Sequence, residues 1–328
     1  MRAFSPVRRH LLAAAAGATA LSSAGSWAQA GYPDRPINLV VGYSAGGAVD
    51  AVARTLGQAL GASLGQPIII DNRPGAGTNI AVKYVIGAKP DGHTLLMAAN
   101  ALAANMALYK PQPFDAETDL VAVSLVGRVP VVIAANANVP YRNIADLIAA
   151  AKAKPGTISF ASPGNGSTPH MAAELFTHAA GIDLMHVPYK GGAQAVTDVA
   201  SGQVPLIAMN ALEVKPLVGS GRLKVLAVLS PERSPIFPDA PTIAESGFKG
   251  FESSVWYAVM APAKTPMPIV ERLHAEVQKA LKLPEVRERM SAVGGEAMPG
   301  SRDMLVRLLH EERVRYAKLV REANIQPD

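Results

Sequence analysis

The stretch LVVGYSAGGAVDAVAR, residues 39–54, decides the fold. It opens with an apolar, β-branched run typical of a buried strand and ends with alanine and valine at helical spacing. The GYSAG at residues 42–46 between them matches two different patterns. One is the G-x-S-x-G elbow that presents the serine of a hydrolase. The other is a glycine-rich turn that opens a helix and holds an anion on its backbone N–H groups.

The first thirty residues have the pattern of a secretory signal peptide. Arginines at positions 2, 8 and 9 precede a short apolar run at 11–25, and an A-Q-A site ends at Ala30. We expect cleavage after about Ala30 and export to the periplasm, through Sec or, because Arg8 and Arg9 are paired, the twin-arginine route. No later apolar run reaches the roughly 18 residues of a membrane span, so a soluble mature chain is expected.

Composition excludes several functions. The chain has no cysteine, which excludes thiol catalysis, cysteine-ligated metals and a lipid-anchored cysteine. The leader holds three arginines and no acidic residue, so its removal lowers the net charge from +5 to +2. A charge this small, with only 5% aromatic residues, argues against nucleic-acid binding, which needs a concentrated basic face or stacking platforms.

Strand-like and helix-like segments alternate through the mature chain. In the first half, apolar strands are predicted at 37–43, 67–75 and 94–100, with helices at 48–65 and 79–92. The pattern repeats from residue 129: strands are predicted at 129–135, 157–164, 184–189, 204–210 and 222–230, with helices at 143–156, 167–181 and 195–203. Asn143 is the expected N-cap of the first of these helices. Such alternation predicts parallel sheets covered by helices on both faces.

The two α/β halves predict two lobes. The helices expected at 268–323 have no strands left to accompany them, so we expect them to pack on the first half and the chain to cross between lobes twice. Two crossings form a hinge, and a hinge between lobes creates a cleft. The predicted boundaries are a signal peptide at 1–30, lobe 1 at 31–130 and 256–328, and lobe 2 at 131–255. A single doubly wound domain is the competing layout.

The second half repeats the strand, glycine turn and helix of the first. In FASPGNGSTPHMAAELF, residues 160–176, Ser167 and Thr168 follow the glycines and can cap the helix. Each helix start offers unpaired N–H groups and a partial positive charge, worth about 0.3–1 kcal/mol to an exposed anion. Two such starts across a cleft would favour a small anion. Micromolar affinity needs about 8 kcal/mol, so closure and direct hydrogen bonds must supply the remainder.

Catalytic and metal sites are less well supported. Ser44 follows the first strand of the mature chain, so no earlier strand can supply the oxyanion donor of a hydrolase elbow. His170 and Glu174, four residues apart, make half of a zinc site, but no further histidine has matching spacing. Trp256 and Tyr257 are expected to pack in the core. We predict no catalytic residues, no metal and no cofactor, with a secreted serine hydrolase as the alternative.

Several longer motifs carry a family resemblance. YPDRPINLVVGYSAGGAVDAVAR, NRPGAG followed by KPDGHTLLM, ASPGNGSTPHMAAELF, HVPYKGGAQA, GRLKVLAVLSPERSPIFPDAPTIAESG and WYAVMAPAKTP occur in this order. The mature chain therefore resembles the substrate-binding receptors of tripartite tricarboxylate transporters, the Bug family. The resemblance implies a monomeric, two-lobe periplasmic binding protein of type II that closes around a small organic carboxylate. Membrane transporter subunits would be its partners, or a signalling protein if the chain is a ligand sensor.

The resemblance also implies ligand contacts. They fall on the turns and strand ends of both lobes: Tyr43, Ser44, Ala45, Gly46, Thr78, Asn79 and Asn100 in the first, and Ser162, Gly164, Asn165, Ser167, Thr168, Tyr189 and Asn210 in the second. His170 would stand behind them. Two positions depart from the family pattern, because Thr78 replaces a usual glycine and Gln194 a usual proline. On this interpretation Ser44 binds the ligand and does not attack it.

Overall fold

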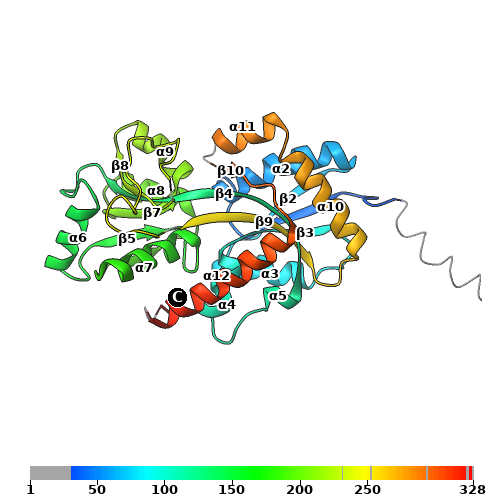
Figure 1. The fold of residues 1–328 in the computed structure, drawn as a ribbon, viewed down its shortest axis with the longest axis horizontal. Coiled ribbons are helices and arrows are strands. Elements are labelled where there is room, and N and C mark those ends of the chain that lie inside the picture. Colours follow the sequence, from blue (N-terminus) through cyan, green and yellow to red (C-terminus); the bar gives the residue numbers. More distant parts are fainter. Residues whose placement is uncertain (1–30, 231, 252, 293–294, 323–324, 327–328) are drawn as a thin grey trace, which may run out of the picture. The chain divides into compact units, whose positions relative to one another are not determined.

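A computed structural model describes residues 31–230, 232–251, 253–292, 295–322 and 325–326. Arg35–Asp328 forms one compact unit, distinct from Met1–Asp34, and all that follows concerns this unit (Figure 1). The predicted signal peptide at 1–30 lies outside the described residues. Within the described ranges, every helix is too short or too polar to cross a bilayer.

The first sheet is built around the strand of the opening stretch. Its strands are β2 (Ile68–Asn72), β1 (Ile37–Val41), β3 (Thr94–Ala99), β9 (Ser254–Pro262) and β4 (Leu120–Asn136), in this spatial order, with the short β10 (Glu296–Ala297) also on β4. The three strands β2, β1 and β3 are parallel, as predicted. The strand β9 runs antiparallel to both β3 and β4, so the sheet is mixed and the prediction of a purely parallel sheet is wrong.

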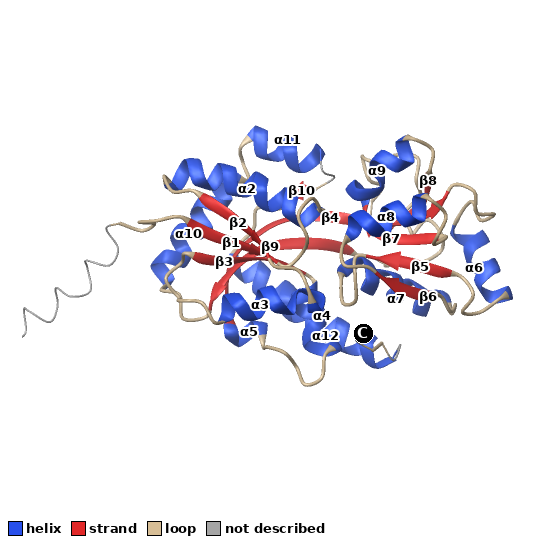
Figure 2. Cartoon of the chain, turned by 180° about the vertical axis from the view of Figure 1, so that it is seen from behind, coloured by secondary structure: helices blue, strands red, loops and turns tan. Residues whose placement is uncertain are grey.

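The second sheet shares β4 with the first. It continues from β4 through β7 (Leu206–Asn210) and β5 (Ser159–Ser162) to β6 (Met185–Pro188), and β8 (Leu223–Val228) also pairs with β4. β4 pairs with β9 as far as Pro130 and with β7 from Val131 onwards. Figure 2 shows β4 and β9 running from the first group of strands toward the second. β5 is parallel to β6 and β7, whereas β4 is antiparallel to β7 and β8.

Helices cover both faces of each sheet. Around the first sheet lie α2 (Ala48–Leu64), α10 (Met267–Ala280) and α11 (Pro284–Ala292) on one face, and α3 (Asn79–Ile86), α4 (Ala101–Leu108), α5 (Ala116–Asp119) and α12 (Arg302–Glu322) on the other (Figure 1). Around the second lie α6 (Ile144–Ala153), α7 (Thr168–Ala180), α8 (Gly192–Ala200) and α9 (Ala211–Gly219). As expected, the C-terminal helices return to the first half, where α10 and α11 contact α2, and α12 contacts α4.

Local signals in the sequence account for several helix ends. The side chain of Asn143 accepts a 2.8 Å hydrogen bond from the N–H of Asp146, so it caps α6 as predicted. α2 ends at Gly65, whose φ of 70° lies in the left-handed region that glycine adopts without strain. The apolar side chains of α2 that face the sheet, among them Val52, Leu56 and Leu60, are almost fully buried.

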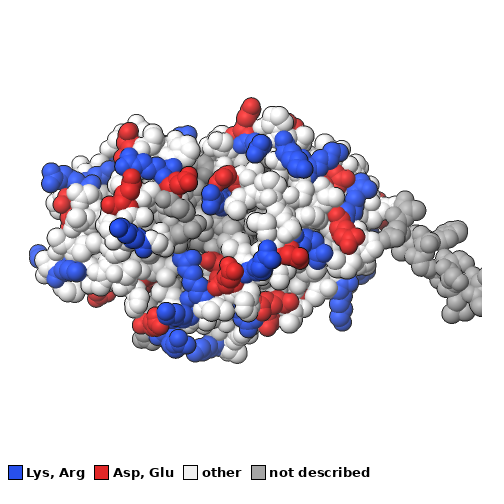
Figure 3. All heavy atoms as spheres, viewed as in Figure 1, with Lys and Arg blue, Asp and Glu red and all other residues white. Residues whose placement is uncertain are grey.

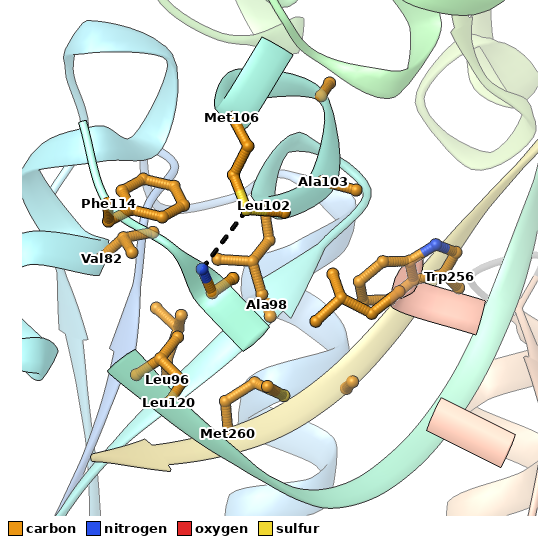
Figure 4. Close-up of a cluster of buried hydrophobic side chains, with 14 of the residues drawn as sticks. Val82, Leu96, Ala98, Leu102, Ala103, Met106, Phe114, Leu120, Trp256 and Met260 are labelled. Atoms are coloured by element: carbon orange, nitrogen blue, oxygen red, sulfur yellow. Dashed lines mark hydrogen bonds between the residues drawn. The ribbon is translucent and has the colours of Figure 1, made fainter. Parts of the chain in front are cut away.

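A separate apolar cluster stabilises each half. The larger one joins β3, α4, β9 and α12 and contains Leu96, Leu102 and Trp256, as Figure 4 shows for part of it. Trp256 is 4% exposed and Tyr257 fully buried, so both pack in the core as expected. The smaller cluster fills the space between β7, α8 and α9. On the face drawn in Figure 3, basic and acidic side chains are interspersed, in keeping with the small net charge.

Candidate ligand-binding site

The turn after β1 is held by close packing on its inner side. A Cβ at Gly42 would lie 2.7 Å from the Cβ of Thr78, which belongs to the short helix η1 (Ala76–Thr78), so a larger residue does not fit at 42. The carbonyl oxygen of Tyr43 accepts a 3.1 Å hydrogen bond from Asn72 Nδ2. The next residues, Ser44 and Ala45, are exposed. The turn therefore has a fixed backbone and presents its tip outward.

The corresponding turn of the second sheet follows β5. Gly164 and Gly166 have φ values of 130° and 71°, which L side chains rarely adopt. The hydroxyl of Ser167 accepts a 3.4 Å hydrogen bond from the N–H of His170 and caps α7. Thr168, the first residue of α7, is 1% exposed, and its Oγ1 has no hydrogen-bond partner. A buried hydroxyl without a partner is costly, so this oxygen is available to bind a ligand.

Two further strand ends complete the site. After β6, Gly191 precedes α8, and the carbonyl oxygen of Lys190 accepts a 3.3 Å hydrogen bond from Ser44 Oγ. This bond joins the β1 turn of the first sheet to a loop of the second. After β7, Asn210 leads into α9; it is 6% exposed, and its Oδ1 has no partner.

These four strand ends enclose a pocket of about 260 Å³. That is slightly below the roughly 300–1,000 Å³ typical of sites for drug-sized ligands, so the pocket suits a small metabolite. It is lined by Tyr43, Ser44, Ala45, Gly47, Ala48, Val49, Pro163, Ser167, Thr168, Pro169, Lys190, Gly191, Gly192, Ala193, Gln194, Asn210, Glu213 and Val255. The starts of α2, α7, α8 and α9 all contribute, so four helix N-termini border one space.

Two carboxylates of the chain itself occupy the start of α2. Asp50 accepts a 3.0 Å hydrogen bond from the N–H of Gly46 and pairs with Arg54 at 2.8 Å. Burial raises the pKa of Asp50, but hydrogen bonds from Arg54, Gly46 and Asn72 outweigh it and lower that pKa overall. The N–H of Ala48 lies 3.5 Å from Glu213 Oε1. Part of the positive end of α2 is therefore already compensated.

Glu213 is the acidic residue among those that line the pocket. Its Oε1 also accepts a 2.9 Å hydrogen bond from Asn210 Nδ2. Burial raises the pKa of the Glu213 carboxyl, and the hydrogen bonds from Asn210 and Ala48 oppose the shift. Burial, with the nearby Glu213 charge, also raises the pKa of the phenols of Tyr43 and Tyr257. The Tyr257 hydroxyl is buried and has no hydrogen-bond partner.

Comparison with known proteins places the chain in a family. Residues 52–325 match the profile of the tripartite tricarboxylate transporter family receptor. The chain belongs to this receptor family. Because the match covers most of the described residues, both lobes are parts of one receptor fold.

Solved structures agree with this membership. The periplasmic binding protein BugD is 34% identical, with a TM-score of 0.84 over 90% of this chain and 100% of BugD. A protein of R. palustris solved with adipate is 34% identical, with a TM-score of 0.85 over 90% and 100% of the two chains. MatC of Rhodopseudomonas palustris, solved with bound malate, is 30% identical, with a TM-score of 0.83 over 88% and 100%. The two-lobe α/β architecture predicted from the sequence is thereby confirmed.

The pocket gathers some of the contacts that the family resemblance implied. Six predicted residues line it: Tyr43, Ser44, Ala45, Ser167, Thr168 and Asn210. The other eight, Gly46, Thr78, Asn79, Asn100, Ser162, Gly164, Asn165 and Tyr189, are not among the lining residues. Hydrogen bonds or packing within the protein account for most of their polar groups.

Asn100 is the clearest structural residue among these eight. Its Nδ2 donates to Glu312 at 2.9 Å and to the carbonyl oxygen of Ser254 at 3.1 Å, while its Oδ1 accepts from the N–H of Trp256 at 2.9 Å. The side chain thus ties β9 and α12 to the end of β3. Both polar atoms of the Asn100 side chain are therefore used in hydrogen bonds within the protein, which stabilise the fold.

Other predicted contacts are engaged in a similar way. Tyr189 donates its hydroxyl proton to Asp198 at 2.9 Å, and Ser162 Oγ lies 2.7 Å from His186 Nε2. Asn79 Oδ1 accepts a 2.8 Å hydrogen bond from Asn105, and Asn165 Nδ2 donates to the carbonyl oxygen of Gln326 at 3.2 Å. Gly46 gives its N–H to Asp50, and Thr78 packs under Gly42.

Sequence reasoning missed the acidic residue of the pocket. Glu213 lies three residues after Asn210, which the structure makes the N-cap of α9. The sequence analysis predicts no helix between the strands at 204–210 and 222–230, where the structure has α9. An Asn followed three residues later by Glu is a helix-start signal that could have identified the position. Lys190, Gln194 and Val255 also line the pocket without having been predicted as ligand contacts.

Ser44 and His170 lack the partners of an active centre. No hydrogen bond among the described residues joins Ser44 to a histidine or an acid; its Oγ donates to the Lys190 carbonyl. His170 Nδ1 accepts a 3.2 Å hydrogen bond from the N–H of Gly166, and its ring stacks on His186 at 4.0 Å. Burial, aided by His186, lowers the pKa of His170. In the described residues no group of three or more potential ligands could hold a metal.

Proposed function

We propose that this protein is a non-enzymatic periplasmic receptor that holds a small organic carboxylate in the pocket between its two sheets. The observation that carries the proposal is the pocket itself, into which turns from both sheets bring helix starts together with the hydroxyls of Ser44 and Thr168. Membership of the receptor family supports it, as do the relatives solved with adipate and malate. Both of those ligands are small carboxylates.

The proposed carboxylate site uses the starts of α7 and α8. Thr168 opens α7 and Gly192 opens α8, and the first turn of a helix has N–H groups without intrahelical partners. Each helix end contributes about 0.3–1 kcal/mol, and up to about 2 kcal/mol when partly buried. A direct hydrogen bond from Thr168 and exclusion of water on closure would supply the rest, while Ser44, which donates its hydroxyl proton to the Lys190 carbonyl, would line the site and link the two sheets. In this role Ser44 binds and does not attack.

Closure would occur between the predicted lobes, 31–130 with 256–328 and 131–255. The change of β4 partners between Pro130 and Val131 supports a hinge at this point. The 3.3 Å hydrogen bond between Ser44 and Lys190 supports a closed arrangement, since it links the two sheets across the pocket. Ligand bound on one lobe would complete its contacts when the other lobe closes on it.

The receptor would deliver its ligand to membrane subunits of a tripartite tricarboxylate-type transporter as a monomer. Export by the predicted leader would place it in the same compartment as the outer face of such a transporter. A ligand sensor that docks on a signalling protein would use the same pocket. Cross-linking in native membranes with and without ligand distinguishes the two, because transporter subunits and signalling proteins are identified directly by mass spectrometry.

Calorimetry tests the proposal. The mature protein is titrated with monocarboxylates, dicarboxylates and tricarboxylates, and native mass spectrometry of freshly purified protein identifies any ligand already bound. At least one carboxylate should bind saturably at a one-to-one ratio. Absence of saturable binding across the panel, from protein shown to be ligand-free, would contradict the proposal.

A further inference from the structure

Glu213 places an acidic group inside a pocket proposed for acids. Its carboxyl group lines the pocket and is held there by Asn210 Nδ2 at 2.9 Å and the N–H of Ala48 at 3.5 Å. A Cβ at Gly192 would overlap Oε2 of Glu213, so this second oxygen lies against the start of α8. The carboxyl therefore sits between the helix starts of the two sheets.

Among the described residues, no lysine, arginine or histidine forms an ion pair with Glu213, although Lys190 lines the same pocket. Asp50 on α2, in contrast, is paired with Arg54. A half-buried carboxylate without a cationic partner is unfavourable, and a ligand carboxylate placed next to it would add repulsion. A ligand with a positive charge would remove both costs.

Two other residues that line the pocket also carry hydrogen-bond acceptors. Oδ1 of Asn210 and Oγ1 of Thr168 are buried and have no partner in the protein. Together with the free oxygen of Glu213 they offer three acceptors, which is the requirement of a protonated amine with three N–H donors. The hydroxyl of Thr168 can also donate, so it can serve either end of a ligand.

The geometry points to a ligand that carries a protonated nitrogen beside its carboxylate, with Glu213 and Asn210 Oδ1 receiving the ammonium group. This inference rests on the proposed function and narrows it from carboxylates in general to amino-acid-type zwitterions. Glu213 becomes a residue that determines specificity, because it attracts an ammonium group and repels a second carboxylate. Because Glu213 lies against the start of α8, the start of α7 remains available for the ligand carboxylate.

The test uses amino acids paired with their desamino analogues. The probes are alanine with propionate, leucine with 4-methylpentanoate, phenylalanine with 3-phenylpropionate and glutamate with glutarate, titrated by calorimetry into the wild-type protein. In at least one pair the amino acid should bind about tenfold to a hundredfold more tightly than its analogue, the range expected for a hydrogen bond between charged groups. This comparison needs no variant and so does not depend on how a variant folds.

The variant Glu213→Gln assigns the effect to Glu213. Glutamine has the same shape and can still accept hydrogen bonds from Asn210 and Ala48, but it carries no charge. The affinity for amino acids should therefore fall by at least tenfold, and the affinity for dicarboxylates should rise. Glu174→Gln is the matched control, since Glu174 is a partly buried carboxyl on α7 that does not line the pocket. It should leave both affinities within twofold of the wild type.

The outcomes separate the inference from the proposed function. Tighter binding of the desamino analogues, or an unchanged ratio in Glu213→Gln, overturns the inference and leaves a carboxylate receptor, with a protonated Glu213 acting as a hydrogen-bond donor. No saturable binding by any probe or by the carboxylate panel overturns both.

Discussion

Two threonines on α7 have opposite polar surroundings. Thr168 Oγ1 is buried and has no partner, whereas Thr177 Oγ1 donates a 3.0 Å hydrogen bond to the carbonyl oxygen of Glu174. We predict that Thr168→Val leaves the free energy of unfolding unchanged or raises it by about 1 kcal/mol, because it removes an unsatisfied polar group. Ligand affinity should fall about tenfold, as measured by calorimetry beside thermal denaturation.

The matched variant Thr177→Val should behave in the opposite way. It breaks a satisfied hydrogen bond and is expected to lower the free energy of unfolding by about 0.5–1.5 kcal/mol while ligand affinity stays the same. Equal loss of stability in both variants would contradict the assignment of the Thr168 hydroxyl to the ligand.

Glu174 predicts a specific pH dependence of stability. Burial, with a smaller contribution from the Asp183 charge, raises the pKa of its carboxyl from 4.5 to about 7. Between pH 4.5 and pH 7 the Glu174 carboxyl is protonated in the folded protein and ionised in the unfolded chain. Its stabilising contribution to the free energy of unfolding is therefore full below pH 4.5 and is lost as the pH rises through 7. Glu174→Gln should therefore gain stability relative to the wild type, by on the order of 3 kcal/mol, between pH 4.5 and pH 8.

Urea denaturation of both proteins across this range measures the difference. Taking the difference cancels the contribution of His186, whose lowered pKa makes stability change in the other direction at acidic pH. His170 Nε2 lies 3.7 Å from Glu174 Oε1, so His170→Gln in both backgrounds serves as the control for this neighbour. A stability difference between Glu174→Gln and the wild type that does not change with pH would show that the carboxyl ionises at its ordinary pKa in the folded protein.

At single positions, sequence reasoning found turns better than it found side-chain roles. The turn at Ser44 and the cap at Ser167 follow from glycines and hydroxyls that are neighbours in the sequence. Asn100 was expected to contact ligand, but its partners include Glu312, more than two hundred residues away. Glu213 was missed for the same reason, since its importance comes from Ala48 and Gly192 in distant segments. Contacts of this kind exist only after folding.

The N-termini of α6 and α7 can be compared because a side chain caps each of them. Asn143 caps α6, which contributes no lining residue, and Ser167 caps α7, which borders the pocket. We predict that Asn143→Ala and Ser167→Ala each lower the free energy of unfolding by about 1 kcal/mol, the usual cost of a lost N-cap. Only Ser167→Ala should weaken ligand binding, because only its helix start faces the ligand. Chemical denaturation and calorimetry on both variants check this.

Most strands lie where short apolar runs predicted them, including β5 to β8 of the second sheet, whereas the first part of β4 and the short β10 were not predicted. β1, β2 and β3 are short apolar runs separated by glycine, proline or polar residues, and all three lie where the pattern placed them. β4 was expected only from Val129, yet it begins at Leu120, because its first part carries two register shifts against β9 that no local pattern announces. The antiparallel direction of β9 depends on the long return of the chain and is likewise not a local property.

For the whole molecule, the proposed closure predicts a change of dimensions on binding. Small-angle scattering should show a smaller radius of gyration with saturating ligand than without it, since the lobes would move together around the ligand. An identical radius of gyration in both states would mean a rigid pocket and would contradict the hinge.

Ser44→Ala tests the link across the pocket. Loss of its hydrogen bond to Lys190 removes about 0.5–1.5 kcal/mol from the closed state, so ligand affinity should fall several-fold. Any background cleavage of a nitrophenyl ester should be the same in the wild type and in the variant. Ester cleavage that disappears with Ser44 would instead support the hydrolase alternative.

The sharing of β4 between both sheets bears on how such receptors can be recombined. A chimaera that takes one half from a relative must join the parents inside a single strand, where both the pairing with β9 and the pairing with β7 and β8 are fixed. A junction at Pro130 would keep both sets of partners only if the two parental strands have equal length and the same irregularities. Exchange of pocket loops alone therefore offers the safer way to graft a new specificity.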